Sequence, residues 1–267
     1  TPFKNDENNN NKIPSPNIEY VLSAAKTLAP FLQKGNLVIV ESTSPVGTTE
    51  QVSKVLETYS TVNVEDIYIT YCPERVIPGK ILNELINNDR VIGGIKTIDA
   101  EIAKNFYSSF CNGKLLTTTT RTAELVKLSE NAFRDINIAF ANELSLVCDE
   151  LKVDTSELIS LSNHHPRVNI LQPGCGVGGH CIAVDPWFIA SAAPDLTNLI
   201  QTARRVNNNK TKWVIKQIKL KEIELRKKLD RIPVIGCLGI TFKPDVDDLR
   251  ESPACEIVED LISSNLN

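Results

Sequence analysis

The chemistry that this sequence offers centres on Cys181, which follows a glycine-rich loop from Pro173 to Gly179. Glycines expose backbone amides and let a ligand or a nucleophile come close to the chain. A thiol becomes a nucleophile when nearby cations or oriented amides lower its pKa, and the thiolate can then attack a carbonyl carbon. Packing as a small buried side chain is the commoner role of a cysteine, and it is our interpretation of the other six. Cys181 is therefore a candidate nucleophile.

A second group of polar side chains lies on one face of a predicted long helix. Lys127, Asn131 and Arg134 are spaced i, i+4 and i+7, which places them on one stripe. Much of the remaining circumference is apolar, so we expect the helix to be largely buried and the stripe to face a polar cleft. The alternative is a solvated face on which the basic residues pair with acidic neighbours, and spacing alone leaves both interpretations open. Those neighbours are Glu124, Glu130 and Asp135.

The cysteines and histidines do not follow the pattern of a metal site or a disulfide framework. The seven cysteines are odd in number, scattered, and include no CxxC pair. His164, His165 and His180 have no acidic residue at ligand spacing, so we expect no metal. Unpaired thiols are typical of a reducing compartment, and we expect a cytoplasmic protein.

The composition narrows the possible partners. The chain has 267 residues and a net charge of -4, whereas nucleic acids and anionic membranes require clustered positive charge. No apolar run approaches the roughly 18 residues of a membrane span, and the first residues do not resemble a signal peptide. The negative net charge is still compatible with a small anionic substrate. A local group of Lys and Arg can bind such a substrate even when the protein as a whole is acidic.

Strands and helices alternate over the first hundred residues, which is the pattern of a doubly wound α/β domain. Short apolar runs predict strands at residues 36–40, 67–71 and 90–94, buried on both faces as in a parallel sheet. Helical spacing predicts a helix over residues 17–33 and another that follows Thr49 and runs through Val55 and Leu56.

Polar residues follow two of these predicted strands. Ser42 and Thr43 come after the first strand, and Glu74 follows the second. In such sheets the ligand lies off the carboxyl ends of the strands, so we expect a site at this edge.

The middle of the chain is predicted to be helical. Residues 122–152 contain neither Gly nor Pro and predict one long helix, a central spine or a dimer element. Further helices are predicted from residue 154 and over about residues 195–229. Residues 234–240 predict a new buried strand and a helix follows near Ser252, which is how a second α/β domain begins.

Six segments, in this order, resemble the UDP-glucose/GDP-mannose dehydrogenase family. They are Ser42–Gly47, Cys72–Arg75, Glu124–Leu128 with Asn131, Gly178–Asp185, Phe242–Asp245 and Arg250–Ser252. The set covers nearly the whole chain and is more specific than any single motif. It therefore favours the nucleophile interpretation of Cys181 and the site interpretation of Lys127.

The resemblance implies an α/β protein in three parts. Residues 1–115 would be the C-terminal part of a Rossmann-like NAD-binding domain. Residues 116–230 would form a central all-helical domain for dimerisation and catalysis, with the long helix as its spine. Residues 231–267 would begin a second Rossmann-like domain that binds the UDP-sugar.

The resemblance also implies a reaction, the oxidation of a sugar C6 alcohol to a carboxylate with two NAD+ in turn. In relatives, a water held by residues matching Thr43 and Asp185 is implicated in taking the first proton. Cys181 would form a thiohemiacetal and then a thioester. Lys127 and Asn131 would stabilise the negative oxygen, at roughly 3–4 kcal/mol per well-placed donor. Glu74 matches a residue linked to hydrolysis of the thioester.

The binding residues come from the same resemblance. Contacts with NAD are expected from Thr1, Thr43 and Arg250. The UDP-sugar would be bound by Arg75, Val76, Lys127, Asn131, Arg134, His165, Arg167, Gly178 and Lys243. A second copy of the chain is the expected protein partner, through the central helical domain.

Three segments narrow the expected substrate within the family. Arg75–Lys80, His165–Asn169 and Cys181–Phe188 favour UDP-N-acetyl-D-mannosamine. UDP-N-acetylglucosamine or another UDP-sugar is the alternative among enzymes. A non-catalytic remnant that dimerises through its helices is the alternative outside them.

The sequence also departs from the family pattern. It lacks the GxGxxG turn of the first βαβ unit, the acidic residue that holds the ribose, and most of the C-terminal domain. We therefore expect a fragment that turns over little substrate by itself. Cys175 stands where Pro or Ala is expected, and the sequence offers no account of it.

Overall fold

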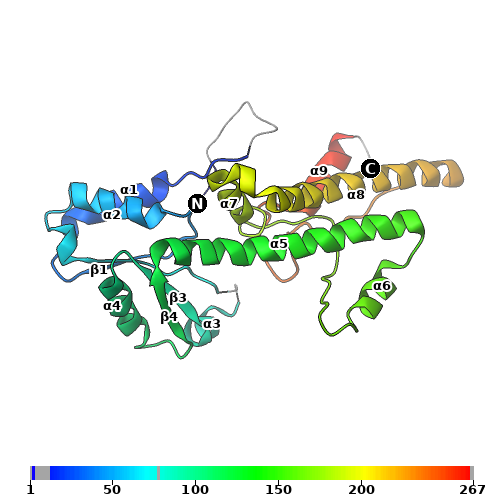
Figure 1. The fold of residues 1–267 in the computed structure, drawn as a ribbon. Helices are drawn as coiled ribbons and strands as arrows, with labels where there is room; N and C mark the ends of the chain where they lie inside the picture. Colours follow the sequence, from blue (N-terminus) through cyan, green and yellow to red (C-terminus); the bar gives the residue numbers. More distant parts are fainter. Residues whose placement is uncertain (1, 4–12, 77–78, 265–267) are drawn as a thin grey trace. The chain divides into compact units, whose positions relative to one another are not determined.

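The computed structural model describes residues 2–3, 13–76 and 79–264 (Figure 1). The chain divides into two compact units. Unit 1 holds Thr1–Glu130 and Trp187–Leu196, and unit 2 holds Asn131–Pro186 and Thr197–Asn267. The asparagine-rich stretch at residues 5–11, whose polarity predicts an exposed loop, lies outside the described residues. The division into three domains stays a prediction.

The predicted strands and helices of the first hundred residues are confirmed, and one strand is additional. Unit 1 contains, in chain order, α1 (Glu19–Leu28), η1 (Ala29–Phe31), β1 (Leu37–Val40), α2 (Thr48–Tyr59), η2 (Val64–Asp66), β2 (Tyr68–Tyr71), α3 (Ile81–Asn87), β3 (Arg90–Gly94), α4 (Thr97–Tyr107), β4 (Leu115–Thr119) and η3 (Pro194–Leu196). Unit 2 contains α6 (Thr155–Ser162), α8 (Asn198–Leu229) and α9 (Pro253–Ser263), and α5 (Thr120–Leu151) and α7 (Asp185–Ala192) carry residues of both units. The additional strand is β4.

The four strands form one sheet in the order β1-β2-β3-β4. β1 pairs with β2 in parallel and β3 with β4 in parallel, but β2 and β3 are antiparallel. The expectation of a wholly parallel sheet is therefore wrong at this junction. A parallel connection needs a crossover helix that covers a face of the sheet, whereas α3 buries no residue. Arg90, the first residue of β3, consequently lies at the same end of the sheet as the last residue of β2.

Helices cover both faces of this sheet, as a doubly wound fold requires (Figure 1). Val38 and Val40 of β1 pack into a cluster with Val52 and Leu56 of α2. The alternate residues of the same strand, Leu37 and Ile39, pack into a second cluster with side chains of α4. Successive side chains of a strand point to opposite faces, so one short strand serves both clusters.

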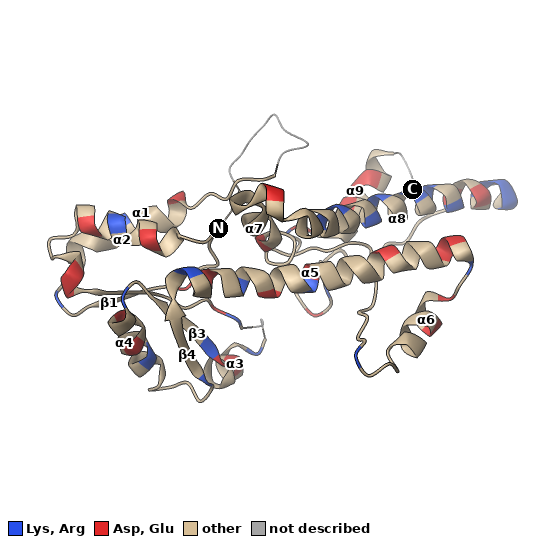
Figure 2. Cartoon of the chain, viewed as in Figure 1, with Lys and Arg blue, Asp and Glu red and all other residues tan. Residues whose placement is uncertain are grey.

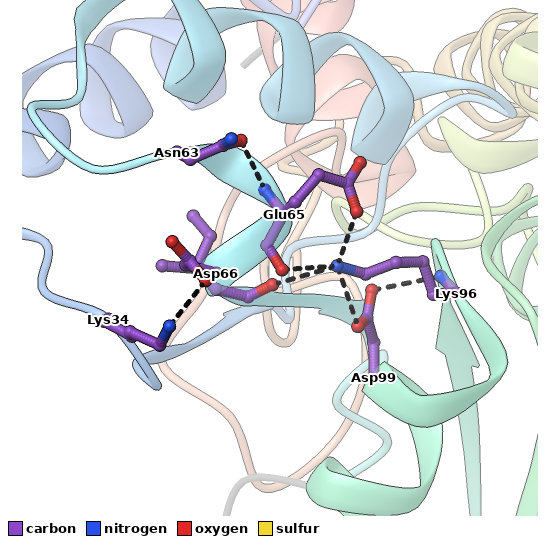
Figure 3. A network of polar contacts seen from close by, with 7 residues as sticks. Lys34, Asn63, Glu65, Asp66, Lys96 and Asp99 are labelled. Atoms are coloured by element: carbon purple, nitrogen blue, oxygen red, sulfur yellow. Dashed lines mark hydrogen bonds and ion pairs between the residues drawn. The ribbon is translucent and has the colours of Figure 1, made fainter.

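Polar contacts hold α4 against the beginning of β2 (Figure 3). The buried carboxylate of Asp99 accepts a 3.0 Å hydrogen bond from the backbone N–H of Lys96. Lys96 Nζ donates to the carbonyl oxygen of Glu65 at 3.2 Å and to its carboxylate at 3.3 Å. Nearby, Lys34 pairs with Asp66 at 3.1 Å. These contacts lie at the edge of the sheet opposite the predicted site.

Buried polar side chains join the two long helices within unit 2. Arg204 NH1 on α8 donates to Asp135 Oδ1 on α5 at 2.7 Å, and Asn207 Nδ2 donates to the same oxygen at 2.7 Å. Asn142 Nδ2 on α5 donates in turn to Asn207 Oδ1 at 2.9 Å. All four side chains are buried, so each bond replaces one that water would have made. Burial raises the pKa of Asp135, and Arg204 and Asn207 act against that rise.

The end of α8 is basic. Figure 2 shows Lys and Arg gathered there, and its last turn carries Arg226, Lys227 and Lys228. Cations near a helix C-terminus are stabilised by the helix dipole. Among the described residues, none of the helices is long and apolar enough to span a membrane.

Two expectations about buried segments are wrong. α5 is not largely buried, since Phe133 is 69% exposed and Phe140 55% exposed. Residues 234–240 form no strand, and Leu238 is fully exposed. A strand satisfies its backbone groups only beside a neighbouring strand, and the described part of unit 2 contains none. The predicted helix near Ser252 is confirmed as α9, with the Ser252 hydroxyl accepting from Cys255 N.

Candidate active site

Three of the predicted catalytic residues are connected within unit 2. Asn131 Nδ2 donates a 2.6 Å hydrogen bond to Asp185 Oδ2, and the two side chains are 4% and 3% exposed. The backbone N–H of Asp185 donates to the carbonyl oxygen of Cys181 at 2.8 Å. Cys181 itself is half-buried in the turn before α7. Asn131, Asp185 and Cys181 thus form one constellation.

The glycine-rich loop before Cys181 is anchored at its start to both long helices. The backbone N–H of Gly174 donates to Asn142 Oδ1 at 2.8 Å, and Thr211 Oγ1 donates to the carbonyl oxygen of Cys175 at 2.9 Å. The Cys175 side chain packs on a buried cluster that includes Ile215, and burial raises its pKa. Packing of a small side chain therefore accounts for this residue.

The end of the same loop lies against residues 242–253. A Cβ atom at Gly178 would lie 2.3 Å from the carbonyl oxygen of Glu251, so glycine is required there. The backbone N–H of Gly179 donates to the carbonyl oxygen of Arg250 at 3.1 Å. Two of the predicted binding residues, Gly178 and Arg250, are thereby brought together. The Arg250 guanidinium forms an ion pair with Asp248 at 2.8 Å, and this partner lowers the pKa of the Asp248 carboxyl.

Unit 1 brings together a different group at the end of β2. Glu74 Oε1 accepts hydrogen bonds from the backbone N–H groups of Arg75 and Val76, at 2.6 and 3.0 Å. Arg75 NH2 forms a 2.7 Å ion pair with Glu130 on α5. The loop at Glu74 therefore lies against α5 one turn after Lys127, which is half-buried.

The basic residues of the stripe on α5 are not paired with the acidic neighbours that the alternative interpretation required. Glu130 pairs with Arg75, and Asp135 pairs with Arg204. Glu124 is buried and accepts from the backbone N–H groups of Gly47 and Thr49. Each of the three acidic residues thus has a partner outside the stripe.

The residues present at this edge fit only part of an NAD molecule. Thr43 is half-buried directly after β1, where its hydroxyl can meet an uncharged part of a ligand. The first amides of α2 would suit a phosphate, but the Glu124 carboxylate occupies Gly47 N and Thr49 N at 2.6 and 2.8 Å. The first turn of α2 therefore does not offer these two amides to the pyrophosphate of the cofactor.

The remaining predicted site residues are less constrained. Arg134 is exposed, and His165 and Arg167 share a turn in which His165 Nδ1 accepts from Arg167 N at 3.3 Å. Lys243 lies over the ring of Phe242. Thr1 lies outside the described residues. The predicted site residues thus belong to two groups, one described in unit 1 and one in unit 2.

Sequence reasoning missed a buried cluster beside Glu74. Arg90 NH1 lies 3.8 Å from Glu74 Oε2, and the Arg90 guanidinium lies 4.7 Å from the centre of the Tyr107 ring. Tyr107 Oη donates to Glu41 at 2.7 Å. Burial raises the pKa of the adjacent Cys72, so this thiol is not an activated nucleophile. The sequence does indicate this cluster in one way: Arg90 is a charged residue at the start of a predicted strand that is otherwise apolar.

An α/β unit with helices on both sheet faces, joined to a unit built on two long helices, is the architecture of nucleotide-sugar dehydrogenases of known structure. A UDP-D-ManNAc dehydrogenase from Pyrococcus horikoshii has this fold, with a TM-score of 0.87 and 41% identity over 94% of this chain and 60% of that one. The chain belongs to the UDP-glucose/GDP-mannose dehydrogenase family. It matches the family's NAD binding domain over residues 1–111, its central domain over 121–209 and its UDP binding domain over 236–267.

Curated relatives whose names specify different sugars are almost equally similar to this chain. A UDP-N-acetyl-D-mannosamine dehydrogenase from Campylobacter jejuni is 54% identical over 99% of this chain and 64% of its own length. An NDP-N-acetyl-D-galactosaminuronic acid dehydrogenase from Ralstonia nicotianae is 51% identical over 94% of this chain and 60% of its own length. The chain therefore spans about 60% of the length of the relatives it matches.

Proposed function

We propose that this chain is the central part of an NAD-dependent UDP-sugar 6-dehydrogenase in which Cys181 is the nucleophile. The observation that carries the proposal is the buried Asn131–Asp185 hydrogen bond, linked through Asp185 N to the backbone of Cys181. Family membership supports the class of reaction. The odd number of cysteines in the sequence and the lack of a CxxC pair are in keeping with a cytoplasmic enzyme.

The cofactor would accept a hydride from C6 twice in one catalytic cycle. The chain's own residues carry out the proton transfers and the reactions of the Cys181 thiol. By resemblance to the family, Thr43 and Asp185 are each assigned to handling the water that receives the proton of the C6 hydroxyl as the alcohol becomes the aldehyde. The Cys181 thiolate then attacks the aldehyde carbon, which forms a C–S bond and places a negative charge on oxygen.

Asn131 is suited to stabilise that oxygen. Its side-chain amide carries two N–H bonds, and the contact with Asp185 uses only one of them. With the Lys127 ammonium it would form an oxyanion site, each well-placed donor contributing roughly 3–4 kcal/mol. Loss of the second hydride leaves a thioester on Cys181. Water oriented by Glu74 attacks this thioester, the C–S bond breaks, and the carboxylate is released with the thiol regenerated.

The proposed substrate is UDP-N-acetyl-D-mannosamine. This choice rests on the sequence segments Arg75–Lys80, His165–Asn169 and Cys181–Phe188. The residues expected to bind the UDP-sugar are Arg75, Val76, Arg134, His165, Arg167, Gly178 and Lys243. UDP-N-acetylglucosamine and other UDP-sugars are the competing substrates, because relatives of nearly equal identity carry names with different sugars.

The test uses the full-length gene product and follows NADH at 340 nm with UDP-N-acetyl derivatives of mannosamine, glucosamine and galactosamine. The wild type is expected to form two NADH per sugar, fastest with the mannosamine derivative. Cys181→Ala should produce no acid, while Cys237→Ala, at an exposed cysteine, should behave as wild type. Full activity of Cys181→Ala would refute the mechanism, and equal rates on all three sugars would refute the substrate.

We also propose that the enzyme is a homodimer through α5. Phe133, Phe140 and Val147 are exposed and spaced by seven residues, so they form one apolar stripe in unit 2. A contiguous exposed apolar stripe is typical of a protein interface. The remaining alternative is a non-catalytic remnant that dimerises through its helices. It predicts that neither the wild type nor Cys181→Ala produces acid, whereas the proposed enzyme predicts acid from the wild type alone.

A further inference from the structure

We propose that Arg90 is a positioning residue that directs the second carboxylate oxygen of Glu74. The inference rests on the proposed function, in which Glu74 assists release of the acid from Cys181. Arg90 itself is 4% exposed and touches neither substrate nor cofactor in this proposal.

The antiparallel junction of the sheet explains why these two residues meet. β2 and β3 pair with Thr70 opposite Gly94 and Tyr71 opposite Gly93. The same register, continued past the end of β2, places Glu74 opposite Arg90. A parallel β3 would have put Arg90 at the other edge of the sheet.

Two kinds of contact fix the Glu74 carboxylate. Oε1 accepts from two backbone N–H groups, those of Arg75 and Val76, at 2.6 and 3.0 Å. Oε2 faces Arg90 NH1 at 3.8 Å. The side chain of Glu74 is still 34% exposed, so water can reach it. A carboxylate held in this way presents one oxygen in a fixed direction.

Arg90 is held in turn by groups from two helices, α3 and α4. NH2 donates to the carbonyl oxygen of Leu85 at 3.2 Å, and the guanidinium lies over the Tyr107 ring of α4. Tyr107 is fixed by its hydrogen bond to Glu41. Burial acts to lower the pKa of Arg90, but Cys72, Glu74 and Tyr107 outweigh it, and the pKa is raised. The guanidinium is therefore a permanent cation with a defined orientation.

A purely structural role for Arg90 predicts a different result from a positioning role. Loss of a structural residue lowers stability and reduces every step in proportion to the folded fraction. Loss of a positioning residue slows the one step that needs Glu74. In the proposed reaction that step is hydrolysis of the thioester, so the covalent adduct on Cys181 should accumulate.

The experiment compares Arg90→Met, Arg90→Lys, Glu74→Gln and wild type in the full-length gene product. Intact-protein mass spectrometry measures the fraction of enzyme carrying the sugar adduct during turnover of UDP-N-acetyl-D-mannosamine, and NADH gives the steady-state rate. Lys96→Met is the matched control, because it removes a cation from the buried Asp99 at the opposite edge of the same sheet. Melting temperatures are recorded for all variants.

Arg90→Met is expected to turn over about 100-fold more slowly, the scale of a small misplacement of a reacting group. Its KM should fall together with kcat, because slowing a step after the adduct has formed leaves kcat/KM unchanged. It should accumulate the adduct as Glu74→Gln does. Arg90→Lys keeps a cation but cannot reach Leu85 and Glu74 together, so its adduct lifetime should lie between those of Arg90→Met and wild type. Lys96→Met should melt at a lower temperature without accumulating adduct.

Two outcomes would overturn the inference, and they differ from failure of the proposed function. Adduct on Glu74→Gln but none on Arg90→Met refutes the role of Arg90 alone. If Arg90→Met does not fold, an Arg90→Lys variant with the wild-type adduct lifetime refutes it equally. Absence of adduct from Glu74→Gln, or activity of Cys181→Ala, instead refutes the proposed mechanism on which the inference depends.

Discussion

Asn131 Nδ2 lies 2.6 Å from Asp185 Oδ2, in a hydrogen bond between two buried side chains that are 54 positions apart in the sequence. The bond fixes the orientation of the Asn131 amide. It also explains how Asp185 can be buried, because a buried carboxylate needs donors. The pair is the best-defined part of the candidate active site.

Replacement of Asn131 by Leu should remove one of the two proposed oxyanion donors. Loss of such a donor typically lowers kcat by about 100- to 1000-fold, and we expect KM to change little. Steady-state NADH kinetics measure the effect. Asn137→Leu is the matched control on the same helix, since the Asn137 amide donates within its own helix, to Phe133 O. An equal loss in both variants would contradict the oxyanion role.

Gly178→Ala should displace the loop that carries the nucleophile. The new methyl group would meet the Glu251 carbonyl oxygen at 2.3 Å, and a shift of about 1 Å at a reacting group can lower the rate about 100-fold. Gly174→Ala is the control, because a Cβ there would meet only Gly176 O, at 3.6 Å. Kinetics of the two variants, with circular dichroism to monitor folding, test the loop. Wild-type rates in Gly178→Ala would show that the loop position does not matter.

Arg204→Met should destabilise unit 2 by leaving Asp135 buried without its ion pair. Breaking a buried pair by removing one partner costs about 3–5 kcal/mol. Urea unfolding at neutral pH measures the change in the free energy of unfolding. Arg205→Met, at the exposed neighbour on α8, should change it by less than about 0.5 kcal/mol. Similar values for the two variants would mean that the buried pair contributes little.

Charges on the α5 stripe should separate the proposed dimer. Phe133→Lys combined with Phe140→Lys places two cations in an apolar interface, where unpaired charge is costly to bury. Sedimentation velocity should find the double variant monomeric at concentrations where the wild type is dimeric. Leu196→Lys, at an exposed leucine that does not belong to α5, should remain dimeric. A dimeric double variant would place the interface elsewhere.

The sequence predicted the elements better than their pairing. Apolar runs located β1, β2 and β3, but the direction of β3 depends on whether the connecting segment crosses the sheet, which periodicity does not reveal. β4 was missed because Leu115–Thr119 is rich in threonine and lacks the apolar run of its neighbours. Residues 234–240 have that run, yet form no strand because no neighbouring strand is available to them.

The same limit applies to the candidate site. Cys181, Asn131 and Asp185 were chosen from motifs, whereas the bond between Asn131 and Asp185 depends on the tertiary fold. Arg90 carries no motif, and its proximity to Glu74 follows only from the antiparallel register. Local patterns can identify residue types that suit a reaction, but contacts between distant segments require the packed structure.

The anchoring of the glycine-rich loop has a consequence for how activity is lost on denaturation. Its first residues are tied to Asn142 and Thr211, which belong to the two helices that pack through the Asp135–Asn207 contacts. Opening the loop at this end therefore costs contacts of the helix pair itself. The nucleophile segment should not melt as an independent local unit. Enzymatic activity and helical circular dichroism should fall together along a urea titration, as one cooperative transition.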